Sequence, residues 1–244
     1  KKRHTVWKNL INWRYGVNAQ EGRELRKTED LLELTSTFSY RKNENSNWFY
    51  SARFNFNTQF SNGYRYPDTD TPISRFMAPG YLFLGVGSEF SHPSEDLTVY
   101  MSPLTQKSTF VFSQRLADEG MFGVTGAVKD EDGNIIERGE NMRTEVGILV
   151  TSEFSKTMWE NIDVSNRISL YTDYLNDFGN VDIDWQLNVN MKVNDFVKAS
   201  VGTHLRYDND VKVKKDVTGD GNLETLGARI QLKQTLGVGV VYEF

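Results

Sequence analysis

The sequence predicts an all-β protein, an antiparallel transmembrane β-barrel with ten strands visible in the chain. Three observations support this prediction. Apolar and polar residues alternate over long segments, the connections alternate between short and long, and aromatic residues gather near the segment ends. Strands that cross a bilayer as a barrel alternate in this way because one face meets lipid and the other meets the lumen. A length of 244 residues fits one domain, 1–244.

Five strands are predicted in the first half of the chain, beginning with the segment from Thr5 to Val17. Each has apolar side chains at every second position and polar or small ones between them. The apolar faces in chain order are Trp7, Ile11, Trp13, Tyr15 and Val17; Leu32, Leu34, Phe38 and Tyr40; Trp48, Tyr50, Ala52, Phe54 and Phe56; Leu82, Leu84, Val86 and Phe90; and, in a shorter strand, Leu97, Val99 and Met101.

The second half of the chain contains the clearest alternation, from Val181 to Val193, and four further strands with the same period. No segment has helical periodicity. The apolar faces are Val146, Ile148, Val150 and Phe154; Ile162, Val164, Ile168, Leu170 and Tyr174; Val181, Ile183, Trp185, Leu187, Val189, Met191 and Val193; Val197, Ala199, Val201, Leu205 and Tyr207; and Ala228, Ile230, Leu232, Leu236, Val238, Val240, Tyr242 and Phe244.

The connections predict the two ends of the barrel. Residues 43–47, 92–95, 156–161 and 194–196 are short turns, whereas residues 19–27, 61–79, 103–141 and the tip near Gly219 are longer loops. Outer-membrane barrels place short turns on the periplasmic side and long loops outside. Within the longest loop, residues 109–112 and 121–124 are expected to form ordered β structure, and Asp132-Gly133 is expected to form a hairpin turn.

The pleat of the strands predicts one register. Asp184 and Arg206 both belong to polar faces, so their strands must pair with matching parity. A two-residue turn at Asn194-Asp195 would place Asp184 opposite the outward Leu205. A three-residue turn over 194–196 places Asp184 opposite Arg206 and is therefore predicted.

The composition excludes several classes of protein. The net charge is −5 and no basic stripe is interleaved with aromatics, which argues against a nucleic-acid partner. The absence of cysteine removes disulfides and thiolate metal sites. A soluble barrel or sandwich would also alternate, but its outer face would be charged. Here the apolar face carries bulky Trp and Tyr, which favours outer-membrane lipid as the surroundings.

The polar faces are expected to line the lumen. Both signs of charge are mixed there, and a barrel of this size has a narrow interior. Unpaired buried charge is costly, so these groups are expected to pair and largely plug the lumen. A channel for a small solute is the alternative. The predicted lumen-lining residues are Arg53, Asn55, Asn57, Arg143, Glu145, Arg167, Asp182, Asp184, Gln186, His204, Arg206, Arg229 and Lys233.

Two constellations could carry chemistry. The segment 216–224 places Asp216, Thr218, Asp220 and Asn222 at alternate positions, like the first half of a calcium loop, although position twelve is Gly227 rather than Glu. A Gly-Asp-Gly turn explains the same segment. In the lumen, Asp182, Asp184 and His204 could act as an acid–base cluster, but no nucleophile is placed by motif and Arg206 is expected to neutralise the aspartates. We therefore predict no enzymatic activity, no catalytic residue and no cofactor besides calcium in that loop.

Several segments resemble an uncharacterised family of Bacteroidota outer-membrane proteins, catalogued as domain of unknown function 3078. The resemblance runs from about Trp7 to Phe244 and implies an outer-membrane location without an assigned activity. It also implies strands upstream of Thr5, so the complete barrel would have twelve strands and this chain would lack an N-terminal segment. The segments that carry the resemblance are residues 28–34 (TEDLLEL), 48–52 (WFYSA), 56–60 (FNTQF), 78–82 (APGYL), 102–105 (SPLT) and 191–194 (MKVN).

Together these features predict an integral protein of a Gram-negative outer membrane. Phe244, at the end of an outward-facing strand, resembles the signal that such barrels present to their assembly machinery. With a plugged lumen, the expected function is a structural or accessory component of an envelope complex, which contacts other envelope proteins through its extracellular loops. The alternative is a porin-like passive or gated channel for a small solute.

Overall fold

The computed structural model describes residues 4–176, 178–215 and 224–240. Within these residues the main feature is a ten-stranded sheet, in which every neighbouring pair of strands is antiparallel. The predicted all-β class and the ten strands are confirmed. In sheet order the strands are β1 (Thr5–Asn18), β2 (Arg26–Tyr40), β3 (Trp48–Thr58), β6 (Gly80–His92), β7 (Leu97–Phe110), β10 (Met142–Trp159), β11 (Ile162–Asp173), β12 (Asp182–Lys192), β13 (Val197–Tyr207) and β16 (Gln231–Val240).

Smaller elements lie in the connections. Three two-stranded hairpins pair β4 (Gly63–Tyr64) with β5 (Pro72–Ser74), β8 (Val128–Lys129) with β9 (Ile135–Glu137), and β14 (Lys212–Lys215) with β15 (Glu224–Ala228). The helical elements are η1 (Pro93–Glu95), α1 (Gln114–Asp118) and η2 (Met121–Gly123).

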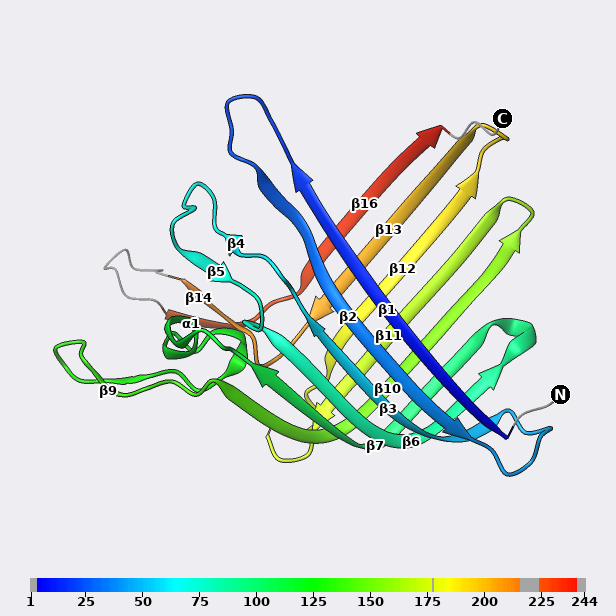
Figure 1. Cartoon of the computed structure of the whole chain (residues 1–244), viewed down its shortest axis with the longest axis horizontal. Coiled ribbons are helices and arrows are strands. Elements are labelled where there is room, and N and C mark those ends of the chain that lie inside the picture. Colours follow the sequence, from blue (N-terminus) through cyan, green and yellow to red (C-terminus); the bar gives the residue numbers. More distant parts are fainter. Residues whose placement is uncertain (1–3, 177, 216–223, 241–244) are drawn as a thin grey trace.

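The sheet is strongly curved, so that β1 and β2 cross in front of β12, β13 and β16 in Figure 1. The short turns after β2, β6, β10 and β12 lie at one end of the sheet, here called the turn end. The longer connections, with α1 and the hairpins, lie at the other, here called the loop end. The predicted alternation of short and long connections is confirmed from β3 onwards, whereas the connections 19–25 and 41–47 are equal in length.

The sheet does not close into a barrel within the described residues. β1 and β16 are its two edges, and no pairing joins them. In this respect the structure differs from the closed barrel that the sequence predicts. The edges nevertheless approach each other at the loop end, where Nζ of Lys233 on β16 lies 2.7 Å from Oε1 of Glu29 on β2. Figure 1 shows the gap widening from there towards the turn end.

The predicted register between β12 and β13 is confirmed. Asp184 pairs with Arg206, and Gln186 pairs with His204. The three-residue turn over 194–196 is held by the side chain of Asn194, whose Oδ1 accepts hydrogen bonds from the backbone N–H groups of Phe196 and Val197, both at 2.8 Å. An Asn that binds backbone two and three residues ahead stabilises a tight turn without a glycine.

β7 is longer than predicted. The sequence suggests a short strand ending near Met101 and a loop from Pro103, but β7 continues to Phe110. The pairing of β7 shifts register around Pro103 with both neighbouring strands. The shift lies between Met101 and Leu104 in the pairing with β6, and between Ser102 and Thr105 in the pairing with β10. A proline has no N–H to donate, and a bulge is one of the few places where a sheet accepts it.

The loop 103–141 also differs from the β structure predicted for residues 109–112 and 121–124. Only 109–110 belong to a strand, while 121–123 form η2. Residues 111–124 instead build a small apolar core with Ala78, containing Val111, Leu116, Ala117 and Val124. The hairpin turn at Asp132-Gly133 is confirmed between β8 and β9, with Gly133 at φ 84°. We call residues 111–141 the cap.

Candidate functional site

The sheet has the reverse of the polarity found in a water-soluble protein. Most of the buried side chains on the concave face are polar or charged, including Glu33, Thr37, Glu89, Lys107 and Glu145. Many of the large apolar side chains point away from this face and are exposed, although a few, such as Tyr100 and Tyr171, are buried on the concave side. Trp7, for example, is 70% exposed. The exposed apolar side chains also include Ile11, Trp13, Phe38, Trp48, Tyr50, Leu84, Val86, Leu104 and Leu236.

The concave face encloses a cavity of about 840 Å³. Most residues that the sequence places in a lumen line it, and Lys107, Tyr171 and Asp208 line it with them. Of the thirteen, ten line this cavity: Arg53, Asn55, Asn57, Arg167, Asp182, Asp184, Gln186, His204, Arg206 and Lys233.

Three of the thirteen residues do not line the cavity. Arg143 and Glu145 on β10 lie beside it, in contact with Lys107 or Asp210. Arg229 lies in the connection between β15 and β16 and is exposed, because β16 begins only at Gln231. The alternation of residues 228–232 suggests a continuous strand, and this placement of Arg229 on its inner face is wrong.

Side chains from distant strands meet across the concave face. Arg167 Nη1 on β11 lies 3.3 Å from Glu33 Oε1 on β2, although four strands lie between β2 and β11 in the sheet. Nearer the loop end, the guanidinium of Arg206 on β13 stacks over the ring of Tyr81 on β6, 5.2 Å from its centroid. Each of these contacts spans the interior from the first strands of the sheet to the later ones, so together they divide the interior.

A second ionic group lies nearer the turn end. Glu89 on β6 is almost fully buried and contacts Lys8 Nζ on β1 at 3.3 Å and Arg53 Nη2 on β3 at 3.7 Å. The Arg53 guanidinium also stacks over the ring of Tyr100 on β7 at 4.2 Å. The Tyr100 hydroxyl occupies the space that a side chain at position 85 would fill, since a Cβ added to Gly85 would lie 2.8 Å from Tyr100 Oη.

The densest ionic group surrounds Lys107 at the loop end of β7. Its ammonium lies 2.8 Å from Asp182 Oδ2, 3.5 Å from Glu145 Oε2 and 3.9 Å from Asp210 Oδ2, and 5.0 Å from the centre of the Tyr171 ring. Arg143 Nη2 completes the group, at 3.0 Å from Asp210 Oδ1 and 3.3 Å from Glu145 Oε1. We call Lys107, Arg143, Glu145, Asp182, Asp208 and Asp210 the loop-end ionic cluster.

The aspartates considered for acid–base chemistry have different partners. Asp182 contacts Lys107, whereas Asp184 Oδ1 accepts a hydrogen bond from Gln186 Nε2 and lies 3.2 Å from His204 Nε2. Arg206, expected to neutralise both, interacts electrostatically with Asp184 but stacks over Tyr81. Asp182 and Asp184 are thus held in two separate groups by different partners.

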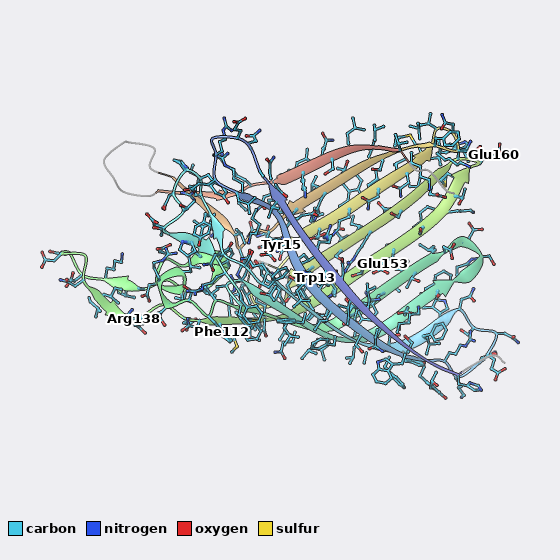
Figure 2. The ribbon with its side chains drawn as sticks, turned by 45° about the horizontal axis from the view of Figure 1, so that its top comes forward. Trp13, Tyr15, Phe112, Arg138, Glu153 and Glu160 are labelled. Carbon is cyan, nitrogen blue, oxygen red and sulfur yellow. The ribbon has the colours of Figure 1, made fainter. Side chains whose placement is uncertain are left out.

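The cap is attached to the sheet by polar contacts. Arg143 Nη1 on β10 donates to the carbonyl oxygen of Gly123 at 3.1 Å. Within the cap, Asp118 accepts hydrogen bonds from Gln114 Nε2, the backbone N–H of Gly139 and Arg138 Nη1 at 2.8–2.9 Å. These three bonds, that from Gln114 first, lower the pKa of the Asp118 carboxyl. In Figure 2 Phe112 and Arg138 lie at this end, opposite Glu160 at the turn end.

Lys107, Asp208 and Asp210 were not predicted as site residues. Lys107 was missed because Pro103 suggested the end of a strand, although Thr105, Lys107 and Thr109 continue a period of two. Asp208 and Asp210 follow β13 in a turn, where acidic residues are common and periodicity gives no signal.

Two predicted features lie outside the described residues. The proposed calcium ligands Asp216, Thr218, Asp220 and Asn222 fall within 216–223, and the assembly signal Phe244 falls within 241–244. Both remain predictions.

Among the described residues, no helix is long and apolar enough to cross a membrane. No curated protein matches the chain. A family model does match the first part of the sequence, where residues 28–34, 48–52 and 56–60 carry the resemblance noted above; the other three resembling segments lie beyond it. Residues 1–64 match the family described as Protein of unknown function (DUF3078), which confirms the family resemblance over that part of the chain.

Proposed function

We propose that the chain forms a transmembrane β-barrel of a Gram-negative outer membrane, with an interior blocked by ionic bridges, and that it acts as a structural or accessory component of an envelope complex. The observation that carries the proposal is the polarity of the sheet. Charged side chains pair on its concave face while large apolar side chains cover the other face. In water this arrangement is unfavourable, and in lipid it is the expected one.

The aromatic side chains support the same orientation. Trp7, Trp48 and Tyr50 lie towards the turn end on the outer face, and Trp13 and Tyr15 lie towards the loop end (Figure 2). Trp7 and Tyr15 belong to one strand, β1, and their spacing corresponds to about 26 Å along it. An outer-membrane barrel has an apolar band roughly 25 Å tall between two aromatic girdles.

The backbone hydrogen-bonding groups of the two open edges need partners if the sheet lies in lipid. Hydrocarbon offers no hydrogen-bond partners, so each unpaired N–H or C=O group of a strand edge costs on the order of several kcal/mol there. The proposal therefore requires that β1 and β16 are both paired in the membrane. The contact between Lys233 on β16 and Glu29 on β2, the strand next to the other edge, already brings the two sides of the sheet together at the loop end.

The accessory role follows from the blocked interior and the ordered loop end. Arg167–Glu33 and Arg206–Tyr81 cross the interior at different levels, so a solute would have to break them to pass. The cap, by contrast, is folded around its own apolar core and projects the β8–β9 hairpin, with Ile136 69% exposed. We propose the hairpin as the surface that contacts other envelope proteins.

A photo-crosslinking amino acid at Ile136 in intact cells tests this partner surface. The expected result is a discrete crosslinked product from Ile136 and none from Glu160, which lies at the opposite end of the molecule. Equal labelling at both positions, or no product at Ile136, would contradict an accessory role through the hairpin.

A second candidate function, a channel for a small polar solute, is favoured by the 840 Å³ cavity. Its charged lining is balanced in sign: Arg14, Arg53, Lys107, Arg167, Arg206 and Lys233 against Glu29, Asp30, Glu33, Asp182, Asp184 and Asp208. Such a lining would not select strongly for either sign of ion.

Conductance of the full-length protein in planar bilayers decides between the two functions. A blocked interior predicts no conductance steps from protein whose folding is verified by its altered gel mobility without heating. The Arg167→Ala variant removes one bridge and is expected to produce small steps. Reproducible steps from the unmodified protein, with a size changed by Arg206→Ala, would replace the accessory function with the channel.

A further inference from the structure

Three carboxylates of the loop-end ionic cluster are close enough to share one metal ion. One oxygen from each of Asp182, Asp208 and Asp210 lies within 4.8 Å of the others. Two oxygens that coordinate the same calcium ion at 2.3–2.6 Å can be no farther apart than about 5 Å. Asp182 begins β12, while Asp208 and Asp210 follow β13, so the three residues join neighbouring strands at the loop end.

The cluster carries more negative than positive charge. Glu145, Asp182, Asp208 and Asp210 supply four carboxylates, and Lys107 and Arg143 supply two cations, which contact all of these carboxylates except that of Asp208. Arg206, the next cation, interacts with Asp208 but also with Asp184 and Tyr81. Uncompensated charge in a partly buried site is costly, so a further positive charge would stabilise the folded chain.

A buried hydroxyl provides an independent sign of a ligand. Tyr171 is only 4% exposed, and its Oη has no hydrogen-bond partner in the part of the chain that the structure describes. Tyr171 is the cross-strand partner of Asp182 on the same face of the sheet. The Lys107 ammonium, which contacts Asp182 at 2.8 Å, lies 5.0 Å from the centre of the Tyr171 ring, so this tyrosine borders the cluster. A buried hydroxyl without a protein partner is uncommon and often marks a bound water or ion.

We propose that Asp182, Asp208 and Asp210 bind a divalent cation, calcium, with the Tyr171 hydroxyl hydrogen-bonded to a metal-bound water. Calcium suits the site because it accepts irregular sets of carboxylates and waters. Lys107 remains paired when Asp182 turns towards the ion, since Glu145 Oε2 is its second acceptor. Its ligands are different residues from those of segment 216–224, for which the sequence suggests a calcium loop.

The position of the site gives the ion a structural consequence. Arg143 contacts both Asp210 and the Gly123 carbonyl of the cap, and a Cβ added to Gly123 would lie 3.3 Å from the Asp210 side chain. An ion that fixes Asp210 therefore also fixes the place where the cap meets β10 and the connection after β13. Calcium is expected to order the cap.

Calorimetric titration of the refolded full-length protein with calcium tests the proposal. Three protein carboxylates and several waters predict a dissociation constant in the range of about 10⁻⁴–10⁻³ M, as in weak extracellular calcium modules. Asp208→Asn is expected to weaken binding at least tenfold, and Tyr171→Phe severalfold while leaving all three carboxylates in place. Asp220→Asn, in the separate segment, is the matched control and should leave this binding unchanged.

Protection of the cap gives a second measurement that does not depend on the heat of binding. Millimolar calcium is expected to slow trypsin cleavage at Arg115 and Arg138 in the unmodified protein and in Asp220→Asn, and to slow it far less in Asp208→Asn. The proposal is overturned if no calcium binds, or if binding and protection survive both Asp208→Asn and Tyr171→Phe. Loss of binding only in Asp220→Asn would also overturn it, because it assigns calcium to the other segment.

Discussion

Arg167 and Glu33 contact each other across the concave face although they are 134 residues apart in the sequence and their strands have four others between them in the sheet. The Glu33 side chain is 8% exposed, and Asn12 and Asn55 also donate hydrogen bonds to it. The contact thus connects β1, β2, β3 and β11. Because it joins parts of the sheet that share no backbone hydrogen bonds, it fixes the curvature of the sheet as well as its interior.

Removing the cation from this contact should destabilise the protein. Arg167→Met leaves the buried Glu33 carboxylate without its charged partner, and we expect a loss of about 1–3 kcal/mol in the free energy of unfolding. The measurement is urea unfolding in detergent micelles. The double variant with Glu33→Gln should recover part of the loss, because both charges are then removed. Asp195→Asn, which breaks an exposed ion pair with Lys192, is the control and should not shift the midpoint.

A new charge should destabilise the protein on one face of β1 much more than on the other. Ile11 is 71% exposed on the outer face. Its neighbour Leu10 is 56% exposed on the opposite face and pairs with Thr35, which lines the cavity. In lipid, Ile11→Arg should lower the free energy of unfolding by about 2–4 kcal/mol if residue 11 lies near the mid-plane of the bilayer, while Leu10→Arg should lower it little. Refolding yield into lipid vesicles measures the difference. Equal yields for the two variants would argue against a membrane location, since water solvates an arginine on either face.

Gly85 is expected to tolerate no side chain. A Cβ there would lie 2.8 Å from Tyr100 Oη, Ser102 Oγ and Thr105 Oγ1, so Gly85→Ala should lower the free energy of unfolding by about 1–3 kcal/mol. Adding Tyr100→Phe removes one of the three oxygens and should recover part of the loss. Gly239→Ala in β16 is the matched control, because a Cβ there meets nothing within 4 Å. A loss in the control equal to that of Gly85→Ala would show that backbone freedom, rather than crowding, is responsible.

The order of the cap should depend on pH through Asp118. Its pKa is lowered in the folded chain by the hydrogen bond from Gln114 and by those from Gly139 and Arg138. A lowered folded pKa means that the stabilisation is complete above the unfolded value of about 3.9 and is lost as the pH falls through the folded value. The backbone N–H groups of Ala117 and Glu119 donate to the carbonyl oxygens of Ser113 and Arg115 around α1. The hydrogen-exchange protection factors of these two amides should therefore be constant above about pH 5 and fall below about pH 4.

The variant Asp118→Asn provides the control for this titration. It removes the titrating group, so the protection of Ala117 and Glu119 should be lower at neutral pH and should change little between pH 5 and pH 3. A variant that keeps the full pH dependence of the original protein would assign the effect to another carboxyl group, such as Asp130 in the β8–β9 turn.

Period-two alternation predicted the strands well because each strand has two different surroundings. The pairing of Asp184 with Arg206 could be derived from parity alone, since a shift by one residue would place charged groups on the apolar face. Of the thirteen residues that alternation predicted to line the lumen, ten line the cavity in the structure. Parity assigns a face, but it does not choose partners. It could not predict that Arg167 would reach Glu33, because that contact depends on how strongly the sheet curves.

The features that were missed have local causes. A five-residue helix such as α1 is too short to show a helical period. Pro103 resembles the start of a loop unless the bulge that accommodates it is known. Whether the edges β1 and β16 join depends on backbone geometry summed over ten strands, which no single segment of sequence encodes.

The polarity of the sheet has a consequence for how the chain can reach its native state. Collapse in water rewards the burial of apolar groups, but here such collapse would gather Trp7, Ile11 and Trp13 in a centre where the native state has charges. The ionic contacts of the interior join residues far apart in sequence and can form only late, after long loops have closed. Under the proposed membrane location, the most stable compact forms before insertion would therefore be misfolded ones. We then expect the chain to be kept extended by a holding chaperone, with the final fold selected by the solvent that it enters.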